Sequence, residues 1–120
     1  MEHNSDFKYD LKFGLKGENL VAEILSNKKI EVKTDKHAIQ GKATGNVFVE
    51  YESHKNPSGI STTEAEWFAF VISNENIILI ETNKLKNICR KYINTKRDVV
   101  GGDNNTSKGV LLPIESLIKL

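Results

Sequence analysis

Lys29-Ile30-Glu31-Val32-Lys33-Thr34-Asp35 is followed, after a polar loop, by Asn46-Val47-Phe48-Val49-Glu50-Tyr51-Glu52. In both segments apolar and polar residues alternate with a period of two, which predicts two β-strands that each have one buried face. If these strands pair as a hairpin, four carboxylates and one lysine gather on one face of the sheet: Glu31, Lys33, Asp35, Glu50 and Glu52. Such a cluster repels itself unless a cation neutralises it, and a hard divalent ion such as Mg²⁺ prefers carboxylate oxygens.

The length and composition of the chain indicate one ordinary globular domain. The sequence has 120 residues, of which 38% are apolar and 28% charged, so we expect a single domain over residues 1–120. A net charge of +1 does not by itself indicate a nucleic-acid-binding protein, so any basic surface must come from local segregation of charge. The single cysteine, Cys89, rules out an internal disulfide and favours an intracellular, cytoplasmic setting. We expect no membrane association, because no apolar run approaches the roughly 20 residues of a membrane span.

The N-terminal part is predicted to contain a loose terminus and one helix. Residues 1–8 are polar and typical of a loose N-terminus, and a helical pattern runs from Leu15 to Leu25. Glu18 lies on the same helical stripe as the apolar residues Val21, Ala22 and Leu25. Two interpretations stay open for Glu18. It is either a functional carboxylate or a charge at the edge of the stripe, favoured there by the helix dipole.

Two connecting segments carry candidate contacts for a phosphate. The loop after Asp35 is long for a hairpin, and His37 within it is either an exposed loop residue or a contact for a substrate phosphate. The second segment is a turn-rich connector that leads into a helix predicted over 61–72, with capping-box patterns at Ser61 and Thr63. Free backbone N–H groups at the start of such a helix would suit a phosphate.

The C-terminal half continues the alternation of strands and helices. A continuous apolar run at 77–80 predicts a central strand, and the stripe formed by Leu85, Ile88, Cys89 and Tyr92 predicts a helix in which Cys89 is a packed thiol. Residues 94–108 are polar and glycine-rich, which predicts a mobile surface loop. A last strand at 110–112 and a short helix at 114–120 complete an α/β domain on a small mixed sheet flanked by helices.

These segments together resemble a known family. The resemblance rests on four segments: Gly14-Leu15-Lys16-Gly17-Glu18, Glu31-Val32-Lys33-Thr34-Asp35, Thr44-Gly45-Asn46-Val47-Phe48-Val49-Glu50-Tyr51-Glu52 and Pro57-Ser58-Gly59-Ile60-Ser61-Thr62-Thr63. Over about residues 10–82 the chain resembles a phage-type member of the PD-(D/E)XK nuclease superfamily, which includes Holliday-junction resolvases. The resemblance implies a restriction-endonuclease-like fold with an α-β-β-β-α-β core, and an activity that cleaves DNA phosphodiesters with Mg²⁺.

The resemblance also implies a catalytic site. Glu18 matches the glutamate of the first helix, Asp35 the metal-binding aspartate of the first motif strand, and Glu50 the acidic residue of the second. The family has a lysine two residues after Glu50, whereas this sequence has Glu52, as some restriction enzymes of the superfamily do. Lys33, predicted on the same strand face as Asp35, can supply the missing ammonium.

A second register of the motif is open, because Glu31-Val32-Lys33 is itself an acid-x-lysine pattern. It ranks below the first, since no acidic residue precedes it at the matching place on an earlier strand. A purely structural interpretation also stands. In it, Glu31, Lys33, Glu50 and Glu52 form a solvated sheet face with cross-strand salt bridges.

We therefore expect a Mg²⁺-dependent deoxyribonuclease that acts on DNA, in which Mn²⁺ can substitute, with Asp35, Glu50 and Glu18 as the metal ligands. A homodimer would let two sites cut two strands. The alternative is a catalytically weak DNA-binding or interaction protein that keeps the nuclease fold. The residues expected to contact DNA lie in the two connecting segments: His37, Lys55, Ser58, Ser61, Thr62 and Thr63.

Overall fold

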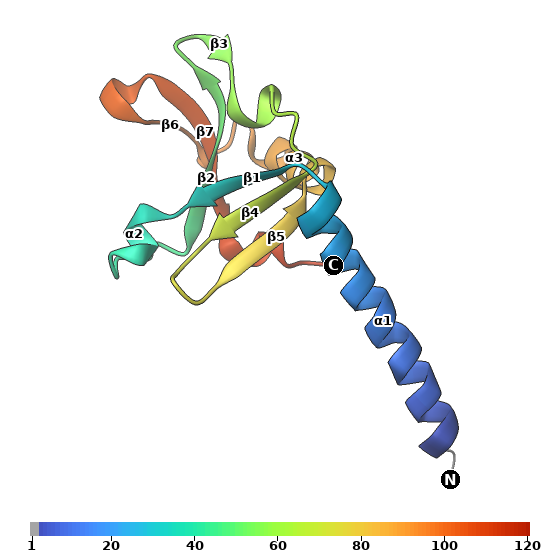
Figure 1. Cartoon of the computed structure of the whole chain (residues 1–120). Helices are drawn as coiled ribbons and strands as arrows, with labels where there is room; N and C mark the ends of the chain where they lie inside the picture. Colours follow the sequence, from blue (N-terminus) through green and yellow to red (C-terminus); the bar gives the residue numbers. More distant parts are fainter. Residues whose placement is uncertain (1–2) are drawn as a thin grey trace.

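The computed structural model describes residues 3–120, with side chains described from Leu11 onward except that of Asp103. It is a mixed α/β structure with two small sheets. Figure 1 shows the two sheets and helix α3 gathered together, while the long N-terminal helix α1 projects away from them. The described residues extend over 63 × 30 × 25 Å, and α1 accounts for the long dimension.

The first sheet has three strands in the order β1-β4-β5. Strand β1 (Ile30–Thr34) runs parallel to β4 (Trp67–Val71), which in turn runs antiparallel to β5 (Ile77–Glu81). The middle strand β4 is rich in aromatic residues, and its central residues Phe68 and Phe70 are buried. Such residues favour a strand that is paired on both edges.

The second sheet has four antiparallel strands in the order β3-β2-β7-β6. These are β3 (Asn56–Pro57), β2 (Asn46–Ser53), β7 (Ser107–Pro113) and β6 (Asp98–Gly101). One core joins both sheets to helix α3 (Thr82–Tyr92). Its buried side chains come from all three parts: Val47, Val49, Phe68, Phe70, Ile80, Leu85, Ile88, Cys89, Val110 and Leu112.

Several predicted elements are confirmed, although the predicted pairing between two of them is wrong. Strands are present at 30–34, 46–53, 77–81 and 107–113, and the 82–92 helix buries Leu85, Ile88 and Cys89 as expected. However, β1 and β2 do not form a hairpin, and the expected single mixed sheet is divided in two. The chain between them carries the short helix α2 (Lys36–Ile39), and it crosses from one sheet to the other.

The helix predicted over 61–72 is absent. A 3₁₀ turn, η1 (Gly59–Ser61), and a short connection lead instead directly into β4. The segment Trp67-Phe68-Ala69-Phe70-Val71 pairs with a strand on each side, so its aromatic and β-branched residues override the local capping signals.

Both termini and one loop also differ from expectation. Helix α1 (His3–Asn27) already begins inside the predicted loose terminus 1–8, of which Met1 and Glu2 lie outside the described residues. The predicted core stripe of this helix is exposed, with 49% of Val21 and 64% of Leu25 accessible. The 94–108 segment contains strand β6 and the turn η2 (Asp103–Asn105), and the C-terminal helix is only a 3₁₀ turn, η3 (Ile114–Leu117).

Candidate functional site

Glu31 and Lys33 form an ion pair on one face of β1. They are two residues apart, so their side chains leave the strand on the same side. The Lys33 ammonium lies 3.1 Å from Glu31 Oε2, while Glu31 Oε1 accepts a hydrogen bond of 2.9 Å from the Thr63 hydroxyl. The Lys33 ammonium and the Thr63 hydroxyl therefore hold both oxygens of the Glu31 carboxylate in place.

Glu50 on β2 is held by the turn that follows β3. The Ser58 hydroxyl donates a 3.0 Å hydrogen bond to Glu50 Oε2, and the Ser58 N–H bonds to the Tyr51 carbonyl. Gly59 follows with φ +53°, and a Cβ built there would lie 2.2 Å from the Glu50 carbonyl oxygen. Only glycine lets the turn approach β2 this closely.

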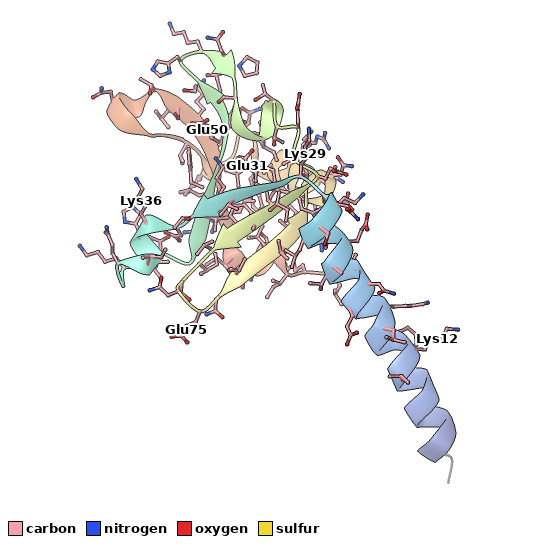
Figure 2. The ribbon with its side chains drawn as sticks, in the orientation of Figure 1. Lys12, Lys29, Glu31, Lys36, Glu50 and Glu75 are labelled. Carbon is pink, nitrogen blue, oxygen red and sulfur yellow. The ribbon has the colours of Figure 1, made fainter. Side chains whose placement is uncertain are left out.

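The two acidic residues meet at one small cavity between the sheets. It is lined by Glu31 and Lys33 from β1, Glu50 from β2 and Gly59 from the turn. Aromatic side chains also line it: Phe48, Phe68 and Phe70. Figure 2 shows Glu31 and Glu50 at the same end of the molecule, with Lys12 far away on α1. The cavity measures about 10 Å³, which is on the scale of one water-sized occupant.

Asp35 lies in an adjoining, larger cavity of about 770 Å³. It is the N-cap of α2, where Oδ1 accepts a 3.1 Å hydrogen bond from the Ala38 N–H. Its other oxygen, Oδ2, is buried and has no hydrogen-bond partner within the described residues. Lys33 lines both cavities, so a lysine stands between Asp35 and the pair Glu31 and Glu50.

Two of the predicted catalytic carboxylates lie elsewhere. Glu18 is exposed on the projecting helix α1. Glu52 is separated from Glu50 by a bulge at Tyr51, because Glu50 pairs with Gly109 and Glu52 with the next residue, Lys108. Neighbouring residues of β7 face opposite sides, so Glu50 and Glu52 do too, and Glu52 lies 3.8 Å from the Lys108 ammonium.

The residues predicted to contact DNA fall into two groups. His37, Lys55 and Thr62 are exposed, and His37 lines the larger cavity. The hydroxyls of Ser58, Ser61 and Thr63 instead bond within the chain, to Glu50, the Tyr51 carbonyl and Glu31 respectively. The α-helix predicted to start there is absent, so the predicted phosphate contacts near Ser61–Thr63 cannot use a helix N-terminus.

From the sequence the register of Glu31 ranks second, and in the structure Glu31 lines the same cavity as Glu50. The acid-x-lysine pattern that it forms with Lys33 was readable, but its proximity to Glu50 depends on how the two sheets pack. The described side chains, those from Leu11 onward without Asp103, contain no preformed group of three His, Cys, Asp or Glu residues suited to a metal ion. Cys89 is buried as predicted, and burial raises the pKa of its thiol to about 12.

The chain matches no known protein-family model, no curated protein and no solved structure. Among the helices of the described part of the chain, none combines the length and the apolar character needed to cross a membrane.

Proposed function

We propose that the chain is a metal-dependent DNA endonuclease with a restriction-endonuclease-like fold. The proposal is supported by one observation above all, the shared cavity of Glu31, Lys33 and Glu50, with Asp35 next to it. Carboxylates that flank a lysine suit phosphodiester hydrolysis, because the reaction needs both a cation site and a donor for developing negative charge.

The carboxylates of this site provide some of the oxygen ligands that a Mg²⁺ ion, or a Mn²⁺ ion in its place, would need. The buried and unpartnered Oδ2 of Asp35 is an oxygen of the kind that a hard cation binds. Glu50 would hold the ion together with either Asp35 or Glu31, and the bound ion would neutralise the phosphate and activate water. The Ser58 and Thr63 hydroxyls would keep Glu50 and Glu31 oriented toward it.

Lys33 has a separate role in this proposal. Its side chain is 49% exposed, so the ammonium can move from Glu31 to a phosphate oxygen. An ammonium donates hydrogen bonds and cannot bind a metal, so Lys33 would stabilise the charge that develops on the phosphate. His37 of the larger cavity, Lys55 of the β2–β3 turn and Thr62 after η1 are exposed and would contact the DNA backbone.

The test is cleavage of labelled branched and linear DNA with Mg²⁺, with Mn²⁺ and with EDTA. We expect metal-dependent cutting that is abolished by Glu50→Gln and by Asp35→Asn, and strongly reduced by Glu31→Gln. Glu75→Gln is the matched control, because Glu75 lies at the β4–β5 turn away from the site. Normal cutting by Glu50→Gln would refute the assignment. Glu18→Gln should cut normally, since Glu18 lies outside the cavity.

A second candidate function is a DNA-binding protein with little catalytic activity. It is favoured by the missing three-carboxylate group in the described residues and by the glutamate at position 52. Binding of the same DNA without cleavage under any metal condition would support it.

A further inference from the structure

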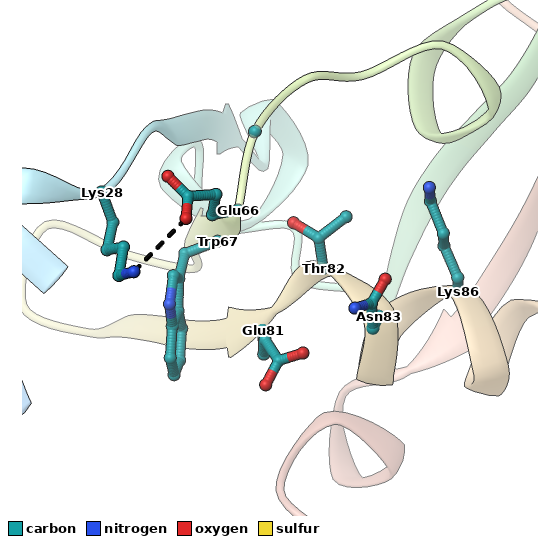
Figure 3. A pocket seen from close by; sticks show the side chains of 8 residues that line it. Lys28, Glu66, Trp67, Glu81, Thr82, Asn83 and Lys86 are labelled. Atoms are coloured by element: carbon teal, nitrogen blue, oxygen red, sulfur yellow. Dashed lines mark ion pairs between the residues drawn. The ribbon is translucent and has the colours of Figure 1, made fainter.

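Another cavity lies at the start of helix α3, and its volume is about 430 Å³. Figure 3 shows the side chains that line it, which come from the residue after α1, from the start of β4 and the residues before it, from the end of β5 and from the first turns of α3. Thr82, Asn83 and Lys86 lie on one side, and Lys28, Glu66 and Trp67 lie on the other. The cavity is independent of the carboxylate site, because Trp67 and Phe68 are neighbours on a strand and therefore face opposite sides of the sheet.

One residue that lines this cavity has a buried hydroxyl without a hydrogen-bond partner among the described residues. Thr82 is only 5% exposed, and its Oγ1 makes no hydrogen bond within the described residues. Figure 3 shows this oxygen on the side of Thr82 that faces Glu66 and Trp67. A buried hydroxyl without a partner costs free energy, so an acceptor bound in the cavity would relieve that cost.

Further donors stand beside this hydroxyl. Helix α3 has 11 residues, and its N-cap, Glu81, makes no side-chain capping bond to the first turn. The N–H of its first residue, Thr82, donates a hydrogen bond to the Glu66 carbonyl, whereas the N–H groups that follow have no acceptor within the helix, and such groups attract anions. Lys86 stands one turn further along and forms no ion pair with a described residue within 4.0 Å. These donors suit a phosphate or a similar oxyanion.

Two carboxylates also line the cavity, Glu66 and Glu81, and that of Glu66 is already neutralised. The Lys28 ammonium lies 3.4 Å from one oxygen of Glu66, and the Lys29 backbone N–H donates a hydrogen bond of 3.3 Å to the other. The bond from Lys29, together with the charge of Lys28, lowers the pKa of Glu66. The charge of Lys86 therefore has no local counterpart other than the exposed Glu81.

We infer that this cavity binds a nucleoside phosphate. The phosphate would accept hydrogen bonds from the Thr82 hydroxyl and the first turn of α3 and would lie beside Lys86, while the base would lie against the indole of Trp67. Base–aromatic stacking tolerates every base, because each has a π-face. A volume of about 430 Å³ is within the range of small-molecule sites. The ligand is either a free mononucleotide or an unpaired nucleotide of DNA.

The single tryptophan of the chain makes the site directly observable. Adenosine monophosphate should quench Trp67 fluorescence with saturation, and more strongly than adenosine or inorganic phosphate at the same concentration. Thr82→Val and Lys86→Gln should each weaken binding by roughly tenfold, the scale of one lost hydrogen bond to a charged group. Lys91→Gln is the matched control, because Lys91 is exposed in the last turn of the same helix.

A short oligothymidylate, as a second probe, distinguishes a free mononucleotide from an unpaired nucleotide of DNA as the ligand. Saturable quenching by both probes assigns the site to an unpaired nucleotide of DNA, and quenching by adenosine monophosphate alone assigns it to free nucleotides. The inference is overturned if neither probe quenches saturably, or if Lys86→Gln binds as tightly as the parent. Circular dichroism checks that Thr82→Val folds. The cleavage assay is a separate readout, so this site and the proposed nuclease activity can fail independently.

Discussion

Lys33 lines both cavities of the candidate site. Replacing it should lower the rate of cleavage without lowering the affinity for the metal. Lys33→Ala should slow DNA cleavage by about 10²-fold or more, the scale of losing one electrostatic stabiliser. Metal affinity measured by calorimetry should stay the same or increase, because positive charge leaves the site. Lys108→Ala is the control, since Lys108 pairs with Glu52 on the other face of β2. If Lys33→Ala is as active as the parent, Lys33 is only the salt-bridge partner of Glu31.

Gly59 is predicted to be the least replaceable glycine at the site. Gly59→Ala adds a methyl group 2.2 Å from the Glu50 carbonyl oxygen, at a φ of +53°. We expect a loss of about 1–3 kcal/mol or more in the free energy of unfolding, measured by urea denaturation. Gly17→Ala is the opposite control, because its Cβ would meet no atom within 4 Å and Ala is the better helix former. A neutral effect of Gly59→Ala would show that the turn can move away from β2.

The ionisation of Tyr51 should make the stability of the fold depend on pH in the alkaline range. Its hydroxyl donates a 2.6 Å hydrogen bond to Asp98, and this bond, with burial and the charge of Asp98, raises the pKa of Tyr51 from 10.0 to about 12. The folded state holds the phenolic proton more tightly, so this contribution is complete below about pH 10 and is lost as the pH rises toward 12.

Tyr51→Phe should therefore cost about 1–3 kcal/mol near neutral pH, because it removes a hydrogen bond to a charged group. The difference in unfolding free energy between the two proteins should shrink between pH 10 and 12, where the parent loses its bond. A difference that stays constant over this range would contradict the assignment.

At the scale of the element, strand positions were predictable but strand partners were not. Alternation and apolar runs correctly located the strands at β1, β2, β5 and β7, because these signals are local. The pairing of β1 with β4 joins segments far apart in the sequence, and no local pattern encodes it. The prediction of the candidate site was limited in the same way. Lys33 and Glu50 were found as strand residues, whereas the approach of Glu31 to Glu50 depends on the packing of the sheets.

The wrong helix at 61–72 has an identifiable cause. Ser61 and Thr63 looked like helix caps, but the Ser61 hydroxyl donates to the Tyr51 carbonyl and the Thr63 hydroxyl to Glu31, and the local bond that Thr63 Oγ1 accepts from the Ala65 N–H starts no helix. A capping residue and a tertiary anchor have the same chemistry, so the sequence does not distinguish them. The aromatic segment that follows then pairs as β4, since it is buried between two strands.

At the scale of the whole molecule, most of the described side chains of helix α1 are exposed rather than packed against the rest of the chain. Among its described side chains only Ile24 is buried, while Leu20 on the same side of the helix is 55% exposed. Lys16 and Glu23 flank this side seven residues apart. In an antiparallel pair of α1 helices each lysine would meet the glutamate of the other copy.

We therefore predict that two copies associate through α1, as a homodimeric nuclease would require. Leu20→Glu should convert dimers to monomers in analytical ultracentrifugation, because it places a charge in the apolar contact. Asn19→Glu adds a charge on the polar side of the same helix and should leave the mass unchanged. A parent protein that sediments as a monomer at all concentrations would rule out this role for α1.

The bulge at Tyr51 has a consequence for how this sequence can evolve. In a regular strand, positions 50 and 52 share a face, and a lysine at 52 would stand beside the carboxylate of Glu50. The bulge turns position 52 to the opposite face, where its side chain meets Lys108. In the proposed nuclease a lysine at position 52 would therefore not reach the site, and Lys33 on β1 would supply the ammonium instead. Homologues that keep the extra residue should vary freely at position 52, whereas homologues that have lost it should carry the lysine.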